Sequence, residues 1–428
     1  MMQARQEALA LSEVSAISFE QHSPGTSNAP RCSPTSVPNE SDDLSLTSAP
    51  PPPSLPSPSV SDFATQLYTV SYLIFFSILG TLSRLGLQTL TFYPGAPVVT
   101  GVLWANAGGC IVMGFLLEDK NLFREEWGLG MGTMLPQELK TSTEWVRKHK
   151  VVKKTIPLYI GLTTGFCGSF TSFSSFMRDA FLALSNDLPN PSGVANLSRS
   201  SGDSFMAVVA VLAITISISM SALVFGAHLA LASDSWLPWL PFRFVRKVVD
   251  RAVVLLAWGC WLGAILMAIW PPDRTDDVPT QEKWRGRALF AIVFAPLGCL
   301  LRFYASLNLN TRIGTFPLGT FAVNIFGTVI EGICYDLQHV SGIGAIPSIN
   351  TPQSPSLHTS CQILQGVMDG FCGCTTTVST WVVELHGLSR RRHAYLYGAL
   401  SVIVAFAFLV VIMGGLRWTR GFQSPACS

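Results

Sequence analysis

Long apolar stretches separated by short polar segments dominate this sequence after about residue 66. Nine of the stretches approach the ~20 residues that a helix needs to cross a bilayer of about 30 Å. They are placed at about residues 67–90, 97–117, 156–184, 205–232, 252–270, 287–307, 315–335, 361–386 and 394–417. The pattern therefore predicts an all-α integral membrane protein with nine transmembrane helices.

The apolar part of the chain carries the same polar pattern twice. At an offset of 218 positions the matched pairs are Gly80 and Gly298, Arg84 and Arg302, Gly101 and Gly319, Asn106 and Asn324, Gly109 and Gly327, and Gly114 and Gly332. A second match, at an offset of 205, aligns GFCGSFTSFSSF (165–176) with GFCGCTTTVSTW (370–381). Two copies of one membrane unit indicate a pathway at the interface between them.

Each copy contains four predicted helices, the first copy within residues 67–232 and the second within 287–417. The linker 233–286 holds one more apolar helix, 252–270, which has no counterpart in either copy. An odd helix between the copies forces the second one to enter the membrane from the opposite side. We therefore expect an inverted repeat in one polypeptide, followed by a short C-terminal tail, 418–428.

The first 66 residues have a different composition from the rest of the chain. They are rich in Ser and Pro, and no apolar core follows a basic start. Such a segment is predicted to be a disordered tail, not a signal peptide. The whole chain is 49% hydrophobic and 13% charged, with a mean hydropathy of +0.39 and a formal charge of +2. No basic stripe indicates nucleic-acid binding.

The positive charges predict the orientation of the chain. The side of the N-terminus carries 18 Lys and Arg residues and the opposite side carries 7. Because cytosolic loops are enriched in Lys and Arg, the N-terminus is predicted in the cytosol and the C-terminus outside. The glycosylation sequon at Asn196 then falls in an external loop, whereas the sequon at Asn39 would be cytosolic and unused.

Cysteines and catalytic motifs point to no metal site and no enzyme. Eight of the ten cysteines lie in or at the ends of predicted spans, and none forms a CxxC pair: Cys110, Cys167, Cys260, Cys299, Cys334, Cys361, Cys372 and Cys374. They are predicted to be small, buried, inert thiols. The chain has no phosphate-binding Gly-Lys-Ser/Thr loop, no HExxH and no GxSxG. This removes the main support for a nucleotide-driven pump or a common membrane hydrolase.

Two features place polar groups inside the predicted membrane region. Asn106 and Asn324 sit at equivalent places in mid-span, where an amide needs a partner or a polar cavity. The third helix of each copy combines glycines with a run of hydroxyls, which favours a helix break whose carbonyls face a cavity or an ion. The alternatives are interhelical hydrogen bonds for the asparagines and close helix packing for the small residues.

These motifs resemble the CrcB-type fluoride channels. The shared features are GxxxR on the first helix, Gly-x4-Asn on the second and GFCGxxT[TS]xS[ST] on the third, each present twice, over most of residues 67–417. The four-one-four plan is similar to that of the eukaryotic fluoride exporters. The resemblance implies a passive fluoride channel in the plasma membrane that acts as a single-chain pseudo-dimer.

The resemblance also implies roles for individual residues. The pore would be lined by asparagines, third-helix aromatic residues and fourth-helix hydroxyls, here Asn106, Phe173, Phe176, Asn324, Trp381, Ser217, Ser221 and Ser401. The carbonyls of Gly168, Thr171, Gly373 and Thr376 would hold a structural Na⁺. The family's acidic position matches Asp179 and Glu384. Thr215 and Ser219 share the four-residue spacing of Ser217 and Ser221, and back-bonding to the helix is the alternative for all these hydroxyls.

The arginines of the first helices form a further matched pair. Arg84 and Arg302 are predicted to give each vestibule a positive charge that concentrates anions. The alternative is that they snorkel from a helix end to the membrane surface.

The second copy departs from the family pattern at both aromatic positions, where it has Val378 and Trp381. Because an aromatic edge carries partial positive charge and valine has none, the two possible pores are predicted to be unequal. An ion-coupled secondary transporter and a non-transporting membrane scaffold are the alternative functions. Coupled transporters usually carry membrane carboxylates or His relays, and only Asp179, Glu331 and Glu384 lie near spans.

Overall fold

The computed structural model describes residues 62–123 except 97 and 99, together with 151–191, 197–270, 283–346 and 355–427. The described residues are mostly helical, and the β-structure among them is limited to two isolated bridges near residues 341–345 and 425. Residues 1–61 of the predicted tail and the sequon residue Asn196 lie outside the described ranges. The first helix begins at Asp62, so residues 62–66 belong to it and not to the tail.

The helices of the first copy follow the predicted order, with the third one divided. The elements are α2 (Asp62–Thr91), α3 (Val102–Glu118), α6 (Pro157–Ile160), the π-helical η2 (Gly161–Cys167), α7 (Gly168–Phe170), α8 (Phe173–Ser185) and α9 (Ser201–Ser233). Local sequence explains several ends. Pro157 starts α6, where its missing N–H is not needed, and Ser200 with Asp203 forms a capping box at the start of α9.

The second copy repeats this plan after the linker. The linker contains α10 (Phe242–Phe244), η3 (Val245–Val249) and α11 (Asp250–Ile269). The second copy contains α12 (Lys283–Leu309), α13 (Leu318–Gln338), α14 (Pro355–Gly366), the π-helical η4 (Val367–Cys372), α15 (Gly373–Thr375), α16 (Ser379–Gly387) and α17 (Arg391–Thr419). A π-helical turn therefore precedes the division of the third helix in both copies.

Six described helices are long and apolar enough to cross a membrane. They are Phe63–Thr91, Ser201–Ser233, Val245–Ile269, Arg287–Leu309, Leu318–Gln338 and Arg391–Thr419. The three other predicted stretches coincide with the shorter apolar helix α3 and with the two divided third helices. The chain is therefore an all-helical, multi-pass membrane protein.

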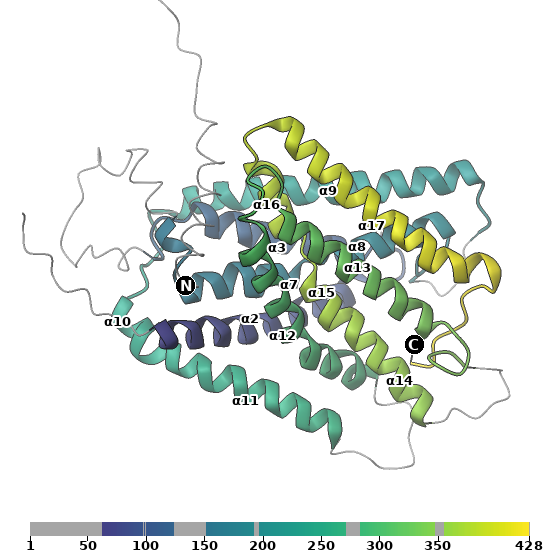
Figure 1. The fold of residues 1–428 in the computed structure, drawn as a ribbon, viewed down its shortest axis with the longest axis horizontal. Helices are drawn as coiled ribbons and strands as arrows, with labels where there is room; N and C mark the ends of the chain where they lie inside the picture. The colour runs from purple at the N-terminus through teal and green to yellow at the C-terminus, as the bar shows by residue number, and fades with distance from the viewer. Residues whose placement is uncertain are drawn as a thin grey trace, which may run out of the picture.

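The first helices of the two copies lie side by side, and α11 runs along the outer side of this pair (Figure 1). Two tryptophans attach α11 to both copies. Trp258 Nε1 donates to Ser71 Oγ of α2 at 3.1 Å, and Trp261 Nε1 donates to the Val293 carbonyl of α12 at 3.0 Å. The remaining surface of α11 is largely exposed and apolar, as expected for a helix that faces lipid.

Glycines allow the second and fourth helices of the first copy to approach closely. A Cβ on Gly114 of α3 would lie 2.0 Å from the Leu223 carbonyl oxygen, and one on Gly226 of α9 would lie 2.0 Å from that of Ile111. Such small-residue contacts bring helix backbones together where lipid supplies no hydrophobic drive. The pair α3 and α9 therefore forms one compact wall of the first copy.

The prediction of inert buried thiols is wrong for two cysteines. Cys361 of α14 forms a disulfide with Cys427, 66 positions later, so the C-terminal segment folds back onto this helix. Cys260 is exposed on α11. The other cysteines of the predicted spans are free and buried, as expected.

Candidate ion pathway

The two predicted helix breaks lie at the centre of the structure and are built alike (Figure 1). α7 and α15 are each followed by a threonine with extended backbone: Thr171 has φ −90° and ψ 151°, and Thr376 has φ −93° and ψ 155°. An extended residue leaves the carbonyls of the preceding turn without helical donors. The break that was predicted from the glycines and hydroxyls is therefore confirmed in both copies.

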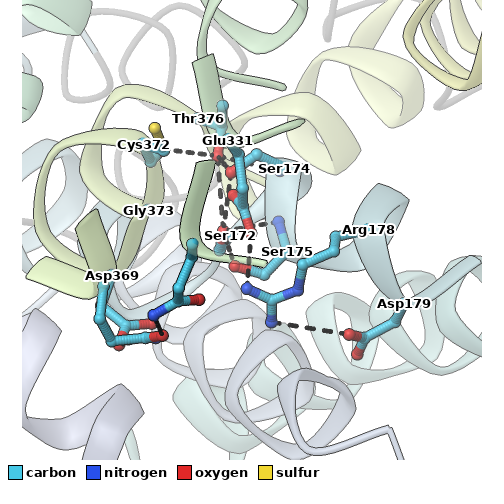
Figure 2. A network of polar contacts seen from close by, with 12 residues as sticks. Ser172, Ser174, Ser175, Arg178, Asp179, Glu331, Asp369, Cys372, Gly373 and Thr376 are labelled. Carbon is cyan, nitrogen blue, oxygen red and sulfur yellow. Dashed lines mark hydrogen bonds and ion pairs between the residues drawn. The ribbon is translucent and has the colours of Figure 1, made fainter. Parts of the chain in front are cut away.

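Each of these threonines caps the helix that follows the break in the other copy. Thr171 Oγ1 accepts from the backbone nitrogen of Ser379 at 3.1 Å, at the start of α16. Thr376 Oγ1 accepts from the backbone nitrogen of Ser174 at 3.1 Å, at the start of α8 (Figure 2). The first turn of a helix has backbone donors without helical partners, so these hydroxyls satisfy donors that would otherwise be unpaired.

The two asparagines bind the breaks in the same way but differ in their amide nitrogens. Asn106 Oδ1 accepts from the Ser172 nitrogen at 2.9 Å, and Asn324 Oδ1 accepts from the Thr377 nitrogen at 2.9 Å. Asn324 Nδ2 also donates to the Thr377 carbonyl at 3.3 Å. Asn106 Nδ2 is buried and has no hydrogen-bond partner among the described residues. The first copy thus keeps a free donor that the second copy uses internally.

The matched arginines extend into the breaks of both copies. Arg84 Nη1 donates to the Ser169 carbonyl at 2.7 Å and to the Gly373 carbonyl at 2.9 Å, and its Nη2 donates to the Asp369 carbonyl. Arg302 Nε donates to the Cys374 carbonyl at 2.8 Å, and its Nη2 donates to the Thr164 carbonyl at 2.8 Å. Ser169 with Cys374, and Thr164 with Asp369, are equivalent at the offset of 205. Each arginine therefore binds carbonyls in the break of its own copy and in the third helix of the other copy, at equivalent positions.

The predicted vestibule position is wrong for Arg84. Its side chain is 0% exposed, because it lies against Gly373 at the crossing of the two breaks. Arg302 is 2% exposed and lines a cavity of about 140 Å³. The same cavity is lined by Met113 of α3, Lys154, and Val383 and Glu384 of α16, among others. A vestibule role therefore remains a prediction for Arg302 alone.

The aromatic residues of the two copies meet in the interior. The ring of Phe173 makes edge contacts with that of Phe176, with centroids 5.9 Å apart, and with that of Trp381, with centroids 5.4 Å apart. All three side chains are buried, as is Val378. Trp381 Nε1 has no hydrogen-bond partner among the described residues. Trp381 thus adds an unpaired donor beside Phe173.

The structure corrects the predicted fourth-helix hydroxyls of the first copy. Ser217 and Ser221 are exposed on α9, whereas Thr215 and Ser219 on the neighbouring face are buried. Ser219 Oγ has no partner among the described residues. Both pairs have the same spacing, and the rotation of α9 about its axis decides which pair faces inward. In the second copy Ser401 is buried, and its hydroxyl donates to the Tyr397 carbonyl at 2.7 Å, which is the back-bonding alternative.

The oxygen atoms around the carbonyls predicted to hold Na⁺ are of the kind that a hard cation binds. These carbonyls belong to the two breaks, and the buried hydroxyls of Ser169 and Thr375 beside them have no partner among the described residues. The Gly373 carbonyl already accepts from Arg84, but a carbonyl oxygen has two lone pairs and can face an ion as well. The donor set therefore fits a small oxygen-coordinated cation.

One ion pair with a fully buried carboxylate was not predicted from the sequence. Arg178 Nη1 of α8 lies 2.9 Å from Glu331 Oε1 of α13, and its Nη2 lies 3.7 Å from Asp179 Oδ1 (Figure 2). Glu331 is 0% exposed. In the sequence Glu331 stands out only as a carboxylate near a span, and Arg178 belongs to none of the repeated motifs. Their charge at positions inside predicted spans was the available signal.

Comparisons with known proteins identify the family. The family described as "CrcB-like protein, Camphor Resistance (CrcB)" matches residues 71–227 and 289–415. Fluoride export protein 1 of Neurospora crassa is 54% identical over 382 residues, which are 86% of this chain and 70% of that protein. Fluoride export protein 1 of Candida albicans is 35% identical over 352 residues, 81% of this chain and 79% of that protein.

A bacterial relative matches about one copy of the repeat. The fluoride-specific ion channel FluC of Pseudomonas aeruginosa is 29% identical over 141 residues, which are 32% of this chain and 98% of that protein. No solved structure matches. Two family segments in one polypeptide, separated by α11, agree with the duplication in the sequence. The chain belongs to the CrcB-like family.

Proposed function

We propose that this protein is a passive fluoride channel that lets cytosolic fluoride leave the cell. One observation carries the proposal: three buried donors without partners, Asn106 Nδ2, Ser219 Oγ and Trp381 Nε1, come from α3, α9 and α16. These three helices pack against one another. The path that they border, with Phe173 beside Trp381, is called the first path below. The fungal and bacterial relatives named above support the same function.

Unpaired donors suit a small, strongly hydrated anion. A buried donor without a partner costs about 1–3 kcal/mol, so a structure that keeps three of them gains when an acceptor enters. Fluoride is an acceptor only, and hydrogen bonds to a charged group are the strong ones. The edge of the buried Phe173 ring adds partial positive charge. Backbone carbonyls that already accept hydrogen bonds from their own helices would not compete with fluoride for these donors.

The cavity beside Arg302 supplies an entrance to the first path. Asn106, Met113 and Leu117 lie on one face of α3, and the last two line the cavity. Arg302 and Lys154 give this cavity two positive groups against the single carboxylate of Glu384. Positive charge in a low-dielectric cleft raises the local concentration of anions. Fluoride would then move down its own gradient, and the chain has no nucleotide motif to drive it.

We further propose nine membrane spans with the copies inverted, the N-terminus in the cytosol and the C-terminus outside. The crossed contacts of the threonines and arginines support a two-fold relation between the copies, since each copy makes the same contact to the other. The single helix α11 between the copies supports their inversion. The count of 18 against 7 positive residues supports the orientation. The disulfide of Cys427 supports an external C-terminus, because disulfides persist in oxidising compartments.

A structural Na⁺ at the crossing of the breaks is part of the proposal. The carbonyls of Gly168, Thr171, Gly373 and Thr376 would hold it, and its charge would stabilise carbonyls that lack helical donors. Because two of these residues come from each copy, the ion would join the copies into the proposed single-chain pseudo-dimer. We place the protein in the plasma membrane, where a passive channel can release fluoride from the cell.

Fluoride efflux from liposomes tests the proposal against its alternatives. Purified protein should release trapped fluoride without ATP or a proton gradient and should retain chloride. Release equal to that of empty liposomes contradicts the proposal and leaves the scaffold alternative. Fluoride movement that requires a proton or sodium gradient supports the ion-coupled transporter instead.

A further inference from the structure

The face of α13 that corresponds to the first path carries a charge where α3 carries none. Asn324, Thr328 and Glu331 lie on one face of α13, four and seven residues along the helix. At the offset of 218 the matching residues of α3 are Asn106, Cys110 and Met113. Glu331 therefore stands where the first copy has methionine, and it is fully buried.

The partner of Glu331 also occupies a matched position. Arg178 of α8 lies 2.9 Å from the Glu331 carboxylate, and at the offset of 205 its counterpart in α16 is Val383. Met113 and Val383 both line the cavity beside Arg302. The same two positions thus border open space in one half of the molecule and hold an ion pair in the other (Figure 2).

Other counterparts of the cavity wall are also filled and paired. Thr164, which lines the cavity, corresponds to Asp369, and Asp369 Oδ2 accepts from Gln365 Nε2 at 2.7 Å. Glu384 corresponds to Asp179, which contacts Arg178. Arg302 corresponds to the fully enclosed Arg84. These contacts leave the second copy's equivalent of the entrance occupied by side chains that hold one another.

The donors of the second copy are also used. Asn324 Nδ2 donates to the Thr377 carbonyl, and Ser401 Oγ donates to the Tyr397 carbonyl. Val378 replaces the aromatic edge that Phe173 supplies in the first path. A fluoride ion would find no free donor at these positions and would meet a carboxylate of its own sign at Glu331.

We infer that the Arg178–Glu331 ion pair closes the second path to fluoride. The second path is the counterpart of the first path, bordered by Asn324, Val378 and Ser401. The inference rests on the proposed channel function. The seal is complementary: Arg178 keeps the carboxylate fixed in the membrane interior, and the carboxylate keeps the arginine from acting as an anion site. Removal of Arg178 alone leaves the fully buried Glu331 carboxylate without its ion pair, so both residues are changed together.

The test uses residues that the chain itself places at the matched positions. The double variant Arg178→Val with Glu331→Met replaces the ion pair by the counterparts Val383 and Met113. In liposomes we expect its fluoride efflux per folded protein to stay within about twofold of the unmodified protein, since the sites are independent. A folded double variant that loses efflux would place the ion pair on the conducting path and overturn the inference.

A gain of function tests the seal directly. Asn106→Asp closes the first path, and addition of Arg178→Val, Glu331→Met and Val378→Phe gives the second path the residues that the first copy or its cavity wall has at these three positions. We expect efflux at least ~10-fold above that of Asn106→Asp alone, equivalent to about 1.4 kcal/mol of barrier. A folded quadruple variant with the efflux of Asn106→Asp shows that the ion pair is not the seal.

Two controls keep the outcomes separate. If the unmodified protein itself releases no fluoride, the proposed function fails and not the seal. If the variants with Val and Met do not fold, as judged by gel filtration and thermal unfolding, Arg178→Gln with Glu331→Gln replaces the charges by amides of similar shape. The amide pair is then measured in the unmodified protein, where efflux should stay within about twofold. It is also measured with Asn106→Asp and Val378→Phe, where efflux should rise at least ~10-fold above that of Asn106→Asp alone.

Discussion

The hydroxyl oxygen of Thr171 lies 3.1 Å from the backbone nitrogen of Ser379, so a residue of the first copy caps a helix of the second. Thr376 and Ser174 make the reverse contact at 3.1 Å. Each copy therefore supplies a hydroxyl that accepts from a backbone nitrogen at the start of the other copy's helix. The two halves of the chain therefore depend on each other at the level of single hydrogen bonds.

Thr171→Val should lower the stability of the folded protein. The hydroxyl accepts from the nitrogens of both Val378 and Ser379, and loss of a helix cap costs about 0.5–2 kcal/mol. Valine keeps the shape of threonine beside Gly109, so packing is conserved. Thermal unfolding of the purified protein measures the effect. Thr91→Val is the control, because its hydroxyl donates only to carbonyls of its own helix; equal shifts for the two variants would contradict the capping role.

Gly373→Ala should disrupt the crossing of the breaks. A Cβ there would lie 2.3 Å from Arg84 Nη2, so the guanidinium must move away from the carbonyls that it binds. Displacing a buried charge from its partners costs about 3 kcal/mol or more. Gly259→Ala on α11 meets nothing within 4 Å and should change stability by less than about 1 kcal/mol. Gel filtration and thermal unfolding compare them, and a Gly373→Ala protein as stable as Gly259→Ala would refute the contact.

Trp381→Phe tests the indole donor without removing the ring. Nε1 has no partner among the described residues, whereas the edge contact with Phe173 can persist. A lost hydrogen bond to a charged group is worth about 1.5–3 kcal/mol, so fluoride efflux should fall roughly tenfold or more. In the control Trp258→Phe, the lost donor binds Ser71 away from the path. If the two variants export fluoride equally fast, Trp381 is a packing residue only.

Reduction of the disulfide should destabilise the protein and report its topology. Loss of a disulfide typically costs about 2–4 kcal/mol, so Cys427→Ser should unfold at lower temperature, while Cys260→Ser, an exposed free thiol, should not. After reduction, a membrane-impermeant maleimide added to intact cells should label Cys427. Labelling that appears only after permeabilisation would put the C-terminus in the cytosol and contradict the proposed orientation.

Much of the fold followed from spacing in the sequence, because membrane spans and helix breaks are local properties. Twenty apolar residues predict a span whatever lies beside them, and the glycines and hydroxyls around Thr171 predict a break. The equivalence of Asn106 and Asn324 followed from the offset alone, and both asparagines bind their breaks at 2.9 Å.

The remaining features depend on helix rotation and on contacts between distant segments. Ser217 and Ser219 have the same chemistry and the same spacing partners, so only the packing of α9 shows that Ser219 is inside. The disulfide joins residues 66 positions apart, and its partners carry no motif. The pairing of Arg178 with Glu331 needs the contact between α8 of the first copy and α13 of the second.

Fluoride release from liposomes that contain the Asn106→Asp variant tests the account most directly. Aspartate keeps the oxygen that accepts from the Ser172 nitrogen at 2.9 Å and replaces the free amide donor by an anionic oxygen. The account predicts rapid release by the unmodified protein, release close to the empty-liposome rate for folded Asn106→Asp, and nearly unchanged release for Val378→Ala in the second path. Unimpaired release by Asn106→Asp would contradict it.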